Sequence, residues 1–176
     1  MQETGAVRAR TLVLMRHAKA ENAAASDHAR DLTPQGRASA AEAGRWLAEQ
    51  VSVPDLVLAS DAVRTLATWR EAALAAGWDV EPRASAAMYA AGPESALDLI
   101  REVPSDVATL VVVGHNPTVA YLAELLDDGT GDDDAITRLV SMGYPPGAAT
   151  LFSFSGEWEG LAESSATVVA FHVGQS

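Results

Sequence analysis

Two arginines and two histidines could do chemistry in this sequence: Arg16, His17, Arg64 and His115. Each of the four residues follows a short apolar run, either directly or within the first turn of the helix that comes next. In an open α/β sheet, residues that follow the strands lie together at the carboxyl ends of those strands, where ligands bind. A guanidinium group matches two phosphate oxygens at once, and a neutral imidazole can act as a nucleophile. Together the four side chains favour a site for a small dianion, and a phosphoryl group fits best. Each residue alone could instead be structural, as a strand end, a helix ion pair or a buried histidine.

Short β-prone runs predict the strands that must position these residues. Uninterrupted apolar runs of this kind are typical of strands buried on both faces of a parallel sheet. Trp78–Glu81 could add a short strand, and two runs near the end of the chain form a hairpin-like pair around Gly156–Ser165. The main predicted strands are Thr11–Met15, Leu56–Ala59, Thr109–Val113, Ala149–Phe154 and Ala166–His172.

Helix signals alternate with these strands. The alternation predicts an α/β fold, a three-layer α/β/α sandwich with a largely parallel central sheet. The acidic stretch Asp127–Asp134 lacks the spacing of an EF-hand and is interpreted as a surface loop without a site. The expected helices run from Thr33-Pro34 to about Gln50, from a cap at Ser60 or Asp61 to Gly77, from Pro93 to Pro104, and from Asn116-Pro117 through Leu126.

Length, charge and composition limit the class of protein. The 176 residues suit one domain over 1–176, and we expect the polar residues 1–10 to form a flexible N-terminus. A formal net charge of −12 would repel nucleic acid and anionic membranes, so neither is an expected partner. The chain has no Cys, and its four His lack the spacing of a metal site, so no metal or other cofactor is expected. No export signal or long apolar segment is found, which predicts a cytoplasmic protein.

Four short motifs occur in order along the chain: Leu12–Ala18 (LVLMRHA), Arg30–Gly36 (RDLTPQG), Ala59–Thr65 (ASDAVRT) and Val113–Pro117 (VGHNP). In this order they resemble the histidine phosphatase superfamily, and within it the short phosphohistidine phosphatases of the SixA type. The length also matches the compact members, which lack insertions. The resemblance implies a phosphoglycerate mutase-like fold.

The resemblance also implies a mechanism without a metal. His17 would attack phosphorus and form a covalent phosphohistidine, which water then hydrolyses. A backbone carbonyl would hold the other ring nitrogen of His17 and fix its tautomer. Arg16, Arg64 and His115 would bind the phosphoryl oxygens through the transition state.

Two further residues and the proton donor are less defined by the motifs. Arg30 matches the basic residue of the family's Arg-x-Leu-Thr motif, which would contact phosphate or substrate; alternatively, it closes the loop before a helix. Asn116 would either bind substrate or only cap a helix. Mutases and general phosphomonoesterases of the superfamily carry a catalytic carboxylate after the second helix, whereas Ala84–Tyr89 contains none. The unassigned candidates for a general acid are Glu81, Asp27, Asp31 and Glu21.

The missing acid favours a substrate whose leaving group needs little protonation. General-acid catalysis typically contributes about 10²–10⁴-fold, and the imidazole leaving from phosphohistidine needs it less than an alkoxide does. The leading hypothesis is therefore a metal-independent phosphatase acting on a phosphohistidine protein, with phosphate or another oxyanion bound in its site. One alternative is a phosphatase of small-molecule phosphomonoesters. The alternative from another class is a non-catalytic phosphate-binding or interaction module.

Overall fold

The computed structural model describes residues 8–174, which form one six-stranded sheet with helices on both faces. The strand order is β3-β2-β4-β1-β5-β6. The three pairs among β1 to β4 are parallel, whereas β5 runs antiparallel to both of its neighbours, β1 and β6. The strands are β1 (Ala9–Arg16), β2 (Leu56–Ser60), β3 (Arg83–Ser85), β4 (Thr109–Gly114), β5 (Ala149–Ser155) and β6 (Ala166–His172).

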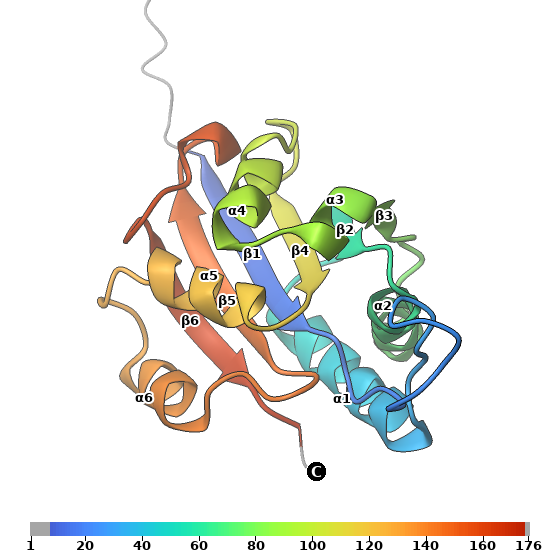
Figure 1. Cartoon of the computed structure of the whole chain (residues 1–176). Helices are drawn as coiled ribbons and strands as arrows, with labels where there is room; N and C mark the ends of the chain where they lie inside the picture. Colours follow the sequence, from blue (N-terminus) through green and yellow to red (C-terminus); the bar gives the residue numbers. More distant parts are fainter. Residues whose placement is uncertain (1–7, 175–176) are drawn as a thin grey trace, which may run out of the picture.

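The helices cover the sheet as two layers (Figure 1). α1 and α2 pack on one face, and α4 and α5 lie on the other. Within residues 8–174, none of the helices has both the length and the apolar character needed to cross a membrane. The helices are α1 (Pro34–Gln50), α2 (Val63–Ala76), α3 (Ala86–Ala90), α4 (Pro93–Arg101), α5 (Thr118–Leu126) and α6 (Asp133–Met142), with a 3-10 turn, η1, at Trp158–Gly160.

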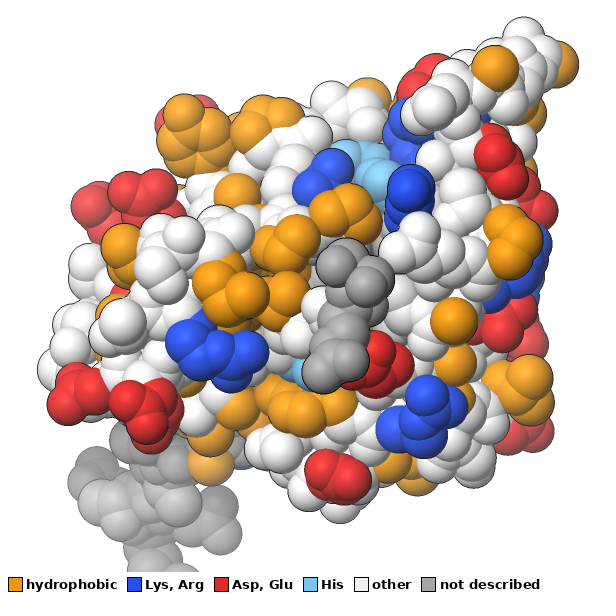
Figure 2. All heavy atoms as spheres, turned by 90° about the horizontal axis from the view of Figure 1, so that it is seen from below, with side chains coloured by type: hydrophobic (Ala, Val, Ile, Leu, Met, Phe, Trp, Pro, Cys, Tyr) orange, Lys and Arg blue, Asp and Glu red, His pale blue; other side chains and the backbone are white. Residues whose placement is uncertain are grey.

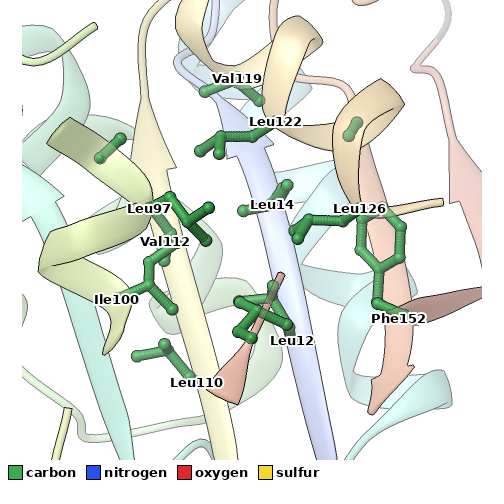
Figure 3. Close-up of a cluster of buried hydrophobic side chains, with 14 of the residues drawn as sticks. Leu12, Leu14, Leu97, Ile100, Leu110, Val112, Val119, Leu122, Leu126 and Phe152 are labelled. Carbon is green, nitrogen blue, oxygen red and sulfur yellow. The ribbon is translucent and has the colours of Figure 1, made fainter. Parts of the chain in front are cut away.

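The central strand β1 joins the two halves of the core because its side chains alternate between the faces. Leu12 and Leu14 belong to the cluster beneath α4 and α5, and Val13 and Met15 belong to the cluster beneath α1 and α2. All four are fully buried, and truncating such a side chain to alanine typically costs about 2–5 kcal/mol. Figure 3 shows the first cluster, in which β1 and β4 face Leu97, Ile100, Val119, Leu122 and Leu126.

Several predicted helix boundaries are confirmed. Thr33 caps α1, its side chain accepting the backbone N–H of Gly36, with Pro34 as the first helical residue. α1 ends at Gln50 as expected, and Gly77 ends α2 in a left-handed conformation that glycine adopts without steric cost.

Other expectations are wrong. The N-cap of α2 is Ala62 and not Ser60 or Asp61. Trp78–Glu81 is not a strand; the edge strand β3 begins later, at Arg83. Helices α3 and α6 were not predicted, although both begin at a side-chain cap, and the end of the acidic stretch predicted as a loop, Asp133 and Asp134, is the first turn of α6.

The start of the chain is ordered earlier than expected. Ala9 and Arg10, placed by the sequence analysis in a flexible segment 1–10, are the first residues of β1, while residues 1–7 lie outside the described part. Arg10 is buried and donates hydrogen bonds to the carbonyls of Val107 and Gly156. Its guanidinium also pairs with Glu157 at 2.8 Å. A polar residue thus belongs to the core because every element around it offers an acceptor.

Candidate active site

Four predicted side chains come from the ends of β1, β2 and β4. Arg16 is the last residue of β1 and pairs in register with Gly114, so that His17 and His115 follow adjacent strands. Their ring centroids lie 5.3 Å apart. Arg64 is the second residue of α2, which follows β2. Figure 2 views this end of the molecule and shows histidine side chains at the surface between Lys and Arg side chains.

His17 has the properties of a neutral nucleophile. Its Nδ1 lies 2.7 Å from the carbonyl oxygen of Ala18, and because a carbonyl only accepts, Nδ1 carries the proton. The lone pair is then on Nε2, which has no hydrogen-bond partner among the described residues. Burial, and next the nearby His115 and arginines, lower the pKa of His17 from 6.5 to about 3. The ring is therefore uncharged at neutral pH, as attack on phosphorus requires.

Ser60 orients the second histidine. His115 Nε2 lies 2.7 Å from Ser60 Oγ, and this oxygen already accepts the backbone N–H of Ala62. When Ser60 donates its proton to Nε2, the His115 proton lies on Nδ1, a buried atom without a partner in the described structure. Burial and Arg64 lower the pKa of His115 to about 4. His115 can thus offer a neutral N–H donor to an oxyanion.

The two arginines are held by oxygens and keep further donors unused. Arg16 donates to the carbonyl of Tyr144 at 3.0 Å, and burial lowers its pKa. Arg64, whose side chain is 6% exposed, donates from its two terminal nitrogens to the carbonyl and the carboxylate of Asp27. The Nε atoms of both arginines are buried without a partner among residues 8–174. Buried N–H groups of this kind require an acceptor, and a phosphoryl oxygen would supply one.

The loop after β1 brings a carboxylate to this cluster. Asp27 Oδ2 accepts from Tyr89 at 2.6 Å as well as from Arg64, and Oδ1 accepts from Arg30. Tyr89 in turn packs edge-on against His115, with the ring centroids 5.5 Å apart. The hydrogen bonds from Tyr89 and Arg64 hold the pKa of Asp27 well below its usual range. Asp27 is therefore an anion, which makes it unsuited to act as the general acid at neutral pH.

The other candidate acids have different partners. Asp31 pairs with Arg37 of α1 at 2.8 Å, and Glu81 lies 3.9 Å from Arg70 with its side chain 81% exposed. Glu21 contributes its main-chain carbonyl to Arg30. None of these contacts involves Arg16, His17, Arg64 or His115, whereas the carboxylate of Asp27 accepts from Arg64.

Arg30 and Asn116 lie beside the site with most of their contacts made. Arg30 binds Asp27 and the carbonyl of Glu21, which supports a role in closing the loop. Asn116 donates to the carbonyl of Tyr144 and accepts from the backbone N–H of Ala120, so its side chain helps to cap α5. A direct contact of either residue with substrate stays a prediction.

A cavity of about 520 Å³ opens beside Lys19, and none of the four site residues lines it. Lys19, which lines the cavity, is two residues beyond His17. Gly147 follows the lining residue Pro146 and donates its backbone N–H to the carbonyl of His17. The remaining wall includes Gln35, Ser39 and Met142.

The polar groups of the site do not form a metal centre within the described residues. Within 8–174 no group of three or more His, Asp or Glu side chains is arranged to hold a metal ion. The polar atoms left without partners at the site are nitrogens of arginine and histidine. These atoms suit an anion, since arginine nitrogens donate and do not accept.

Comparisons with known proteins agree with this geometry. A model of the histidine phosphatase superfamily (branch 1) matches residues 12–88. The uncharacterized protein Rv1276c of Mycobacterium tuberculosis is 35% identical over 160 residues, which cover 90% of this chain and 99% of the relative.

Two solved structures are also similar. The proposed phosphohistidine phosphatase SixA from Nakamurella multipartitia has a TM-score of 0.77 and 32% identity, covering 96% of this chain and 98% of its own. The proposed SixA from Agrobacterium tumefaciens has a TM-score of 0.75 and 28% identity, covering 93% and 97%.

The fold and the cluster of neutral histidines and arginines define a phosphatase-type enzyme of the α/β class. The chain belongs to the histidine phosphatase superfamily, and its type is that of SixA. The phosphoglycerate mutase-like α/β fold implied by the sequence motifs is thereby confirmed.

Proposed function

We propose that this chain is a metal-independent phosphatase that uses His17 as its nucleophile and removes phosphate from phosphohistidine in proteins. The observation that carries the proposal is the state of His17. Its Nδ1 proton is held by the Ala18 carbonyl, its Nε2 lone pair is free, and its low pKa keeps the ring neutral. We also expect the cytoplasm as its compartment, as the sequence predicts.

The reaction would proceed in two displacements. In the first, His17 Nε2 bonds to phosphorus while the bond from phosphorus to the leaving group breaks, and the leaving group takes up a proton from solvent. Arg16, Arg64 and the Nδ1–H of His115 would bind the phosphoryl oxygens, where charge is held in the transition state. In the second, a water oxygen bonds to phosphorus, the bond to Nε2 breaks, and the water gives up a proton as orthophosphate leaves.

The proposed substrate class follows from the lack of a suitable proton donor among the four candidate carboxylates. Among the four carboxylates considered, only Asp27 reaches the cluster, and its pKa is held too low for proton donation at neutral pH. An imidazole leaving group needs less protonation than an alkoxide, so this site suits a phosphoramidate better than an alkyl ester.

The test is phosphate release from a protein phosphorylated on histidine by phosphoramidate, beside para-nitrophenyl phosphate and with EDTA present. We expect rapid, EDTA-resistant release from phosphohistidine, slow turnover of the ester, and no release by His17→Ala. His172→Gln is the matched control, because His172 stacks on Trp46 of α1 and has no contact with His17. Faster turnover of the ester or of a phosphorylated metabolite would favour the small-molecule alternative. Phosphate binding without turnover of either substrate would favour the interaction module.

A further inference from the structure

Asp27 receives more polar contacts than any role as a proton donor needs. Its Oδ2 accepts from Tyr89 at 2.6 Å and from Arg64 at 3.1 Å, and its Oδ1 accepts from Arg30 at 3.1 Å. The main-chain carbonyl of the same residue accepts from the other terminal nitrogen of Arg64 at 2.8 Å. Asp27 therefore ties together the loop after β1, the start of α2, and α3.

We infer that Asp27 is a positioning residue, which fixes the guanidinium of Arg64 for phosphoryl binding and sets the charge of the site to match a dianion. This inference rests on the proposed function, because it assigns a task in the same site. Asp27 acts through Arg64 and does not exchange a proton with the substrate.

The contacts with Arg64 fix the plane of its guanidinium. Two hydrogen bonds from its two terminal nitrogens to one residue prevent the group from rotating, and its side chain is 6% exposed. The Nε–H, which has no partner in the described structure, then has one fixed direction. A free arginine side chain loses rotamer entropy when it is ordered. Because Asp27 already orders the guanidinium in the free enzyme, this entropy is not lost when the transition state forms.

The charges at the site support the second task. At neutral pH both histidines are uncharged, since their pKa values are about 3 and about 4. Arg16, Arg30 and Arg64 bring three positive charges, and the carboxylate of Asp27 leaves a net charge of two. A phosphoryl dianion neutralises that charge. A third uncompensated charge would bind the orthophosphate product more tightly without stabilising the transition state further.

The experiment compares Asp27→Asn and Asp27→Ala with the wild type on a series of aryl phosphates whose leaving groups differ in pKa. We expect kcat to fall about tenfold to hundredfold, as for the loss of a charge-assisted hydrogen bond, by the same factor for every leaving group and with KM not raised. Tyr89→Phe removes one donor to the same carboxylate and should lower kcat by a smaller, equally uniform factor. The matched control is Asp98→Asn, because Asp98 also pairs with an arginine three residues later, Arg101, on the exposed side of α4.

A loss that grows with the pKa of the leaving group would overturn the inference and make Asp27 a proton donor. Unchanged kcat in both Asp27 variants would also overturn it. Calorimetric binding of inorganic phosphate separates this inference from the proposed function, since it needs no turnover. Asp27→Asn should bind phosphate at least as tightly as the wild type does, because the site gains positive charge. Weaker binding than the wild type would refute the charge-matching role even if the wild type proved inactive on every substrate.

Discussion

The buried, neutral state of His17 predicts a specific loss of stability in mild acid. Burial lowers its pKa in the folded protein from 6.5 to about 3, so the unfolded chain binds more protons below pH 6.5. The contribution of His17 is complete above the unfolded pKa and is lost as the pH falls toward the folded pKa. At about pH 5, some 1.5 units below the unfolded value, the loss is about 2 kcal/mol at 1.36 kcal/mol per unit.

The assay is urea unfolding followed by tryptophan fluorescence at about pH 7 and about pH 5, in buffers free of phosphate. Wild type should lose about 2 kcal/mol more unfolding free energy between the two pH values than His17→Gln, whose side chain does not titrate. The pKa of His115 is lowered too, but this side chain is partly exposed. The pH dependence of the unfolding free energy should therefore differ less between wild type and His115→Gln than between wild type and His17→Gln. Thr118→Ala is the control, since it removes a hydrogen bond to Ala91 without a titrating group and should keep the wild-type pH dependence. Equal pH dependence in wild type and His17→Gln would refute the neutral, buried nucleophile.

Two further substitutions test the supports of the site. Gly36→Ala should destabilise the protein by about 1–3 kcal/mol in urea unfolding, because a Cβ there would lie 2.1 Å from the carbonyl oxygen of Lys19 and force the backbone apart. Gly92→Ala has open space around it, and equal stability of the two variants would contradict this packing argument. Ser60→Ala should lower kcat about tenfold with KM little changed, because His115 loses the partner that fixes its tautomer. Steady-state kinetics measure this effect, and a wild-type kcat in that variant would show that Ser60 does not orient His115.

Local sequence predicted the elements that carry strong signals. The β-prone runs in β1, β2 and β4 are almost wholly apolar, which is typical of strands buried on both faces of a sheet. The cap at Thr33 and the stop at Gly77 act within a few residues, which makes them readable from the chain. By contrast, the short edge strand β3 and the helix α3 depend on neighbours in space, and their sequences contain little periodicity.

For the candidate site, the sequence predicted the four main side chains but not the residues that hold them in place. The sequence predicted that the four candidate side chains gather at one edge of the sheet, because each lies at or just after a strand end or at the start of a helix. Sequence could not assign their supports. Arg64 meets Asp27 across 37 positions, His115 meets Ser60 across 55, and Arg16 meets the Tyr144 carbonyl across 128.

The sequence by itself thus determined the chemical groups of this protein and the strand ends that present them. Only the tertiary structure decided their protonation states and orientation. The reason is that a pKa depends on burial and on charges from distant segments, and that the supports of Arg64 and His115, the Asp27 carboxylate and the Ser60 hydroxyl, lie far away along the chain, although the carbonyl that holds His17 Nδ1 belongs to its neighbour Ala18.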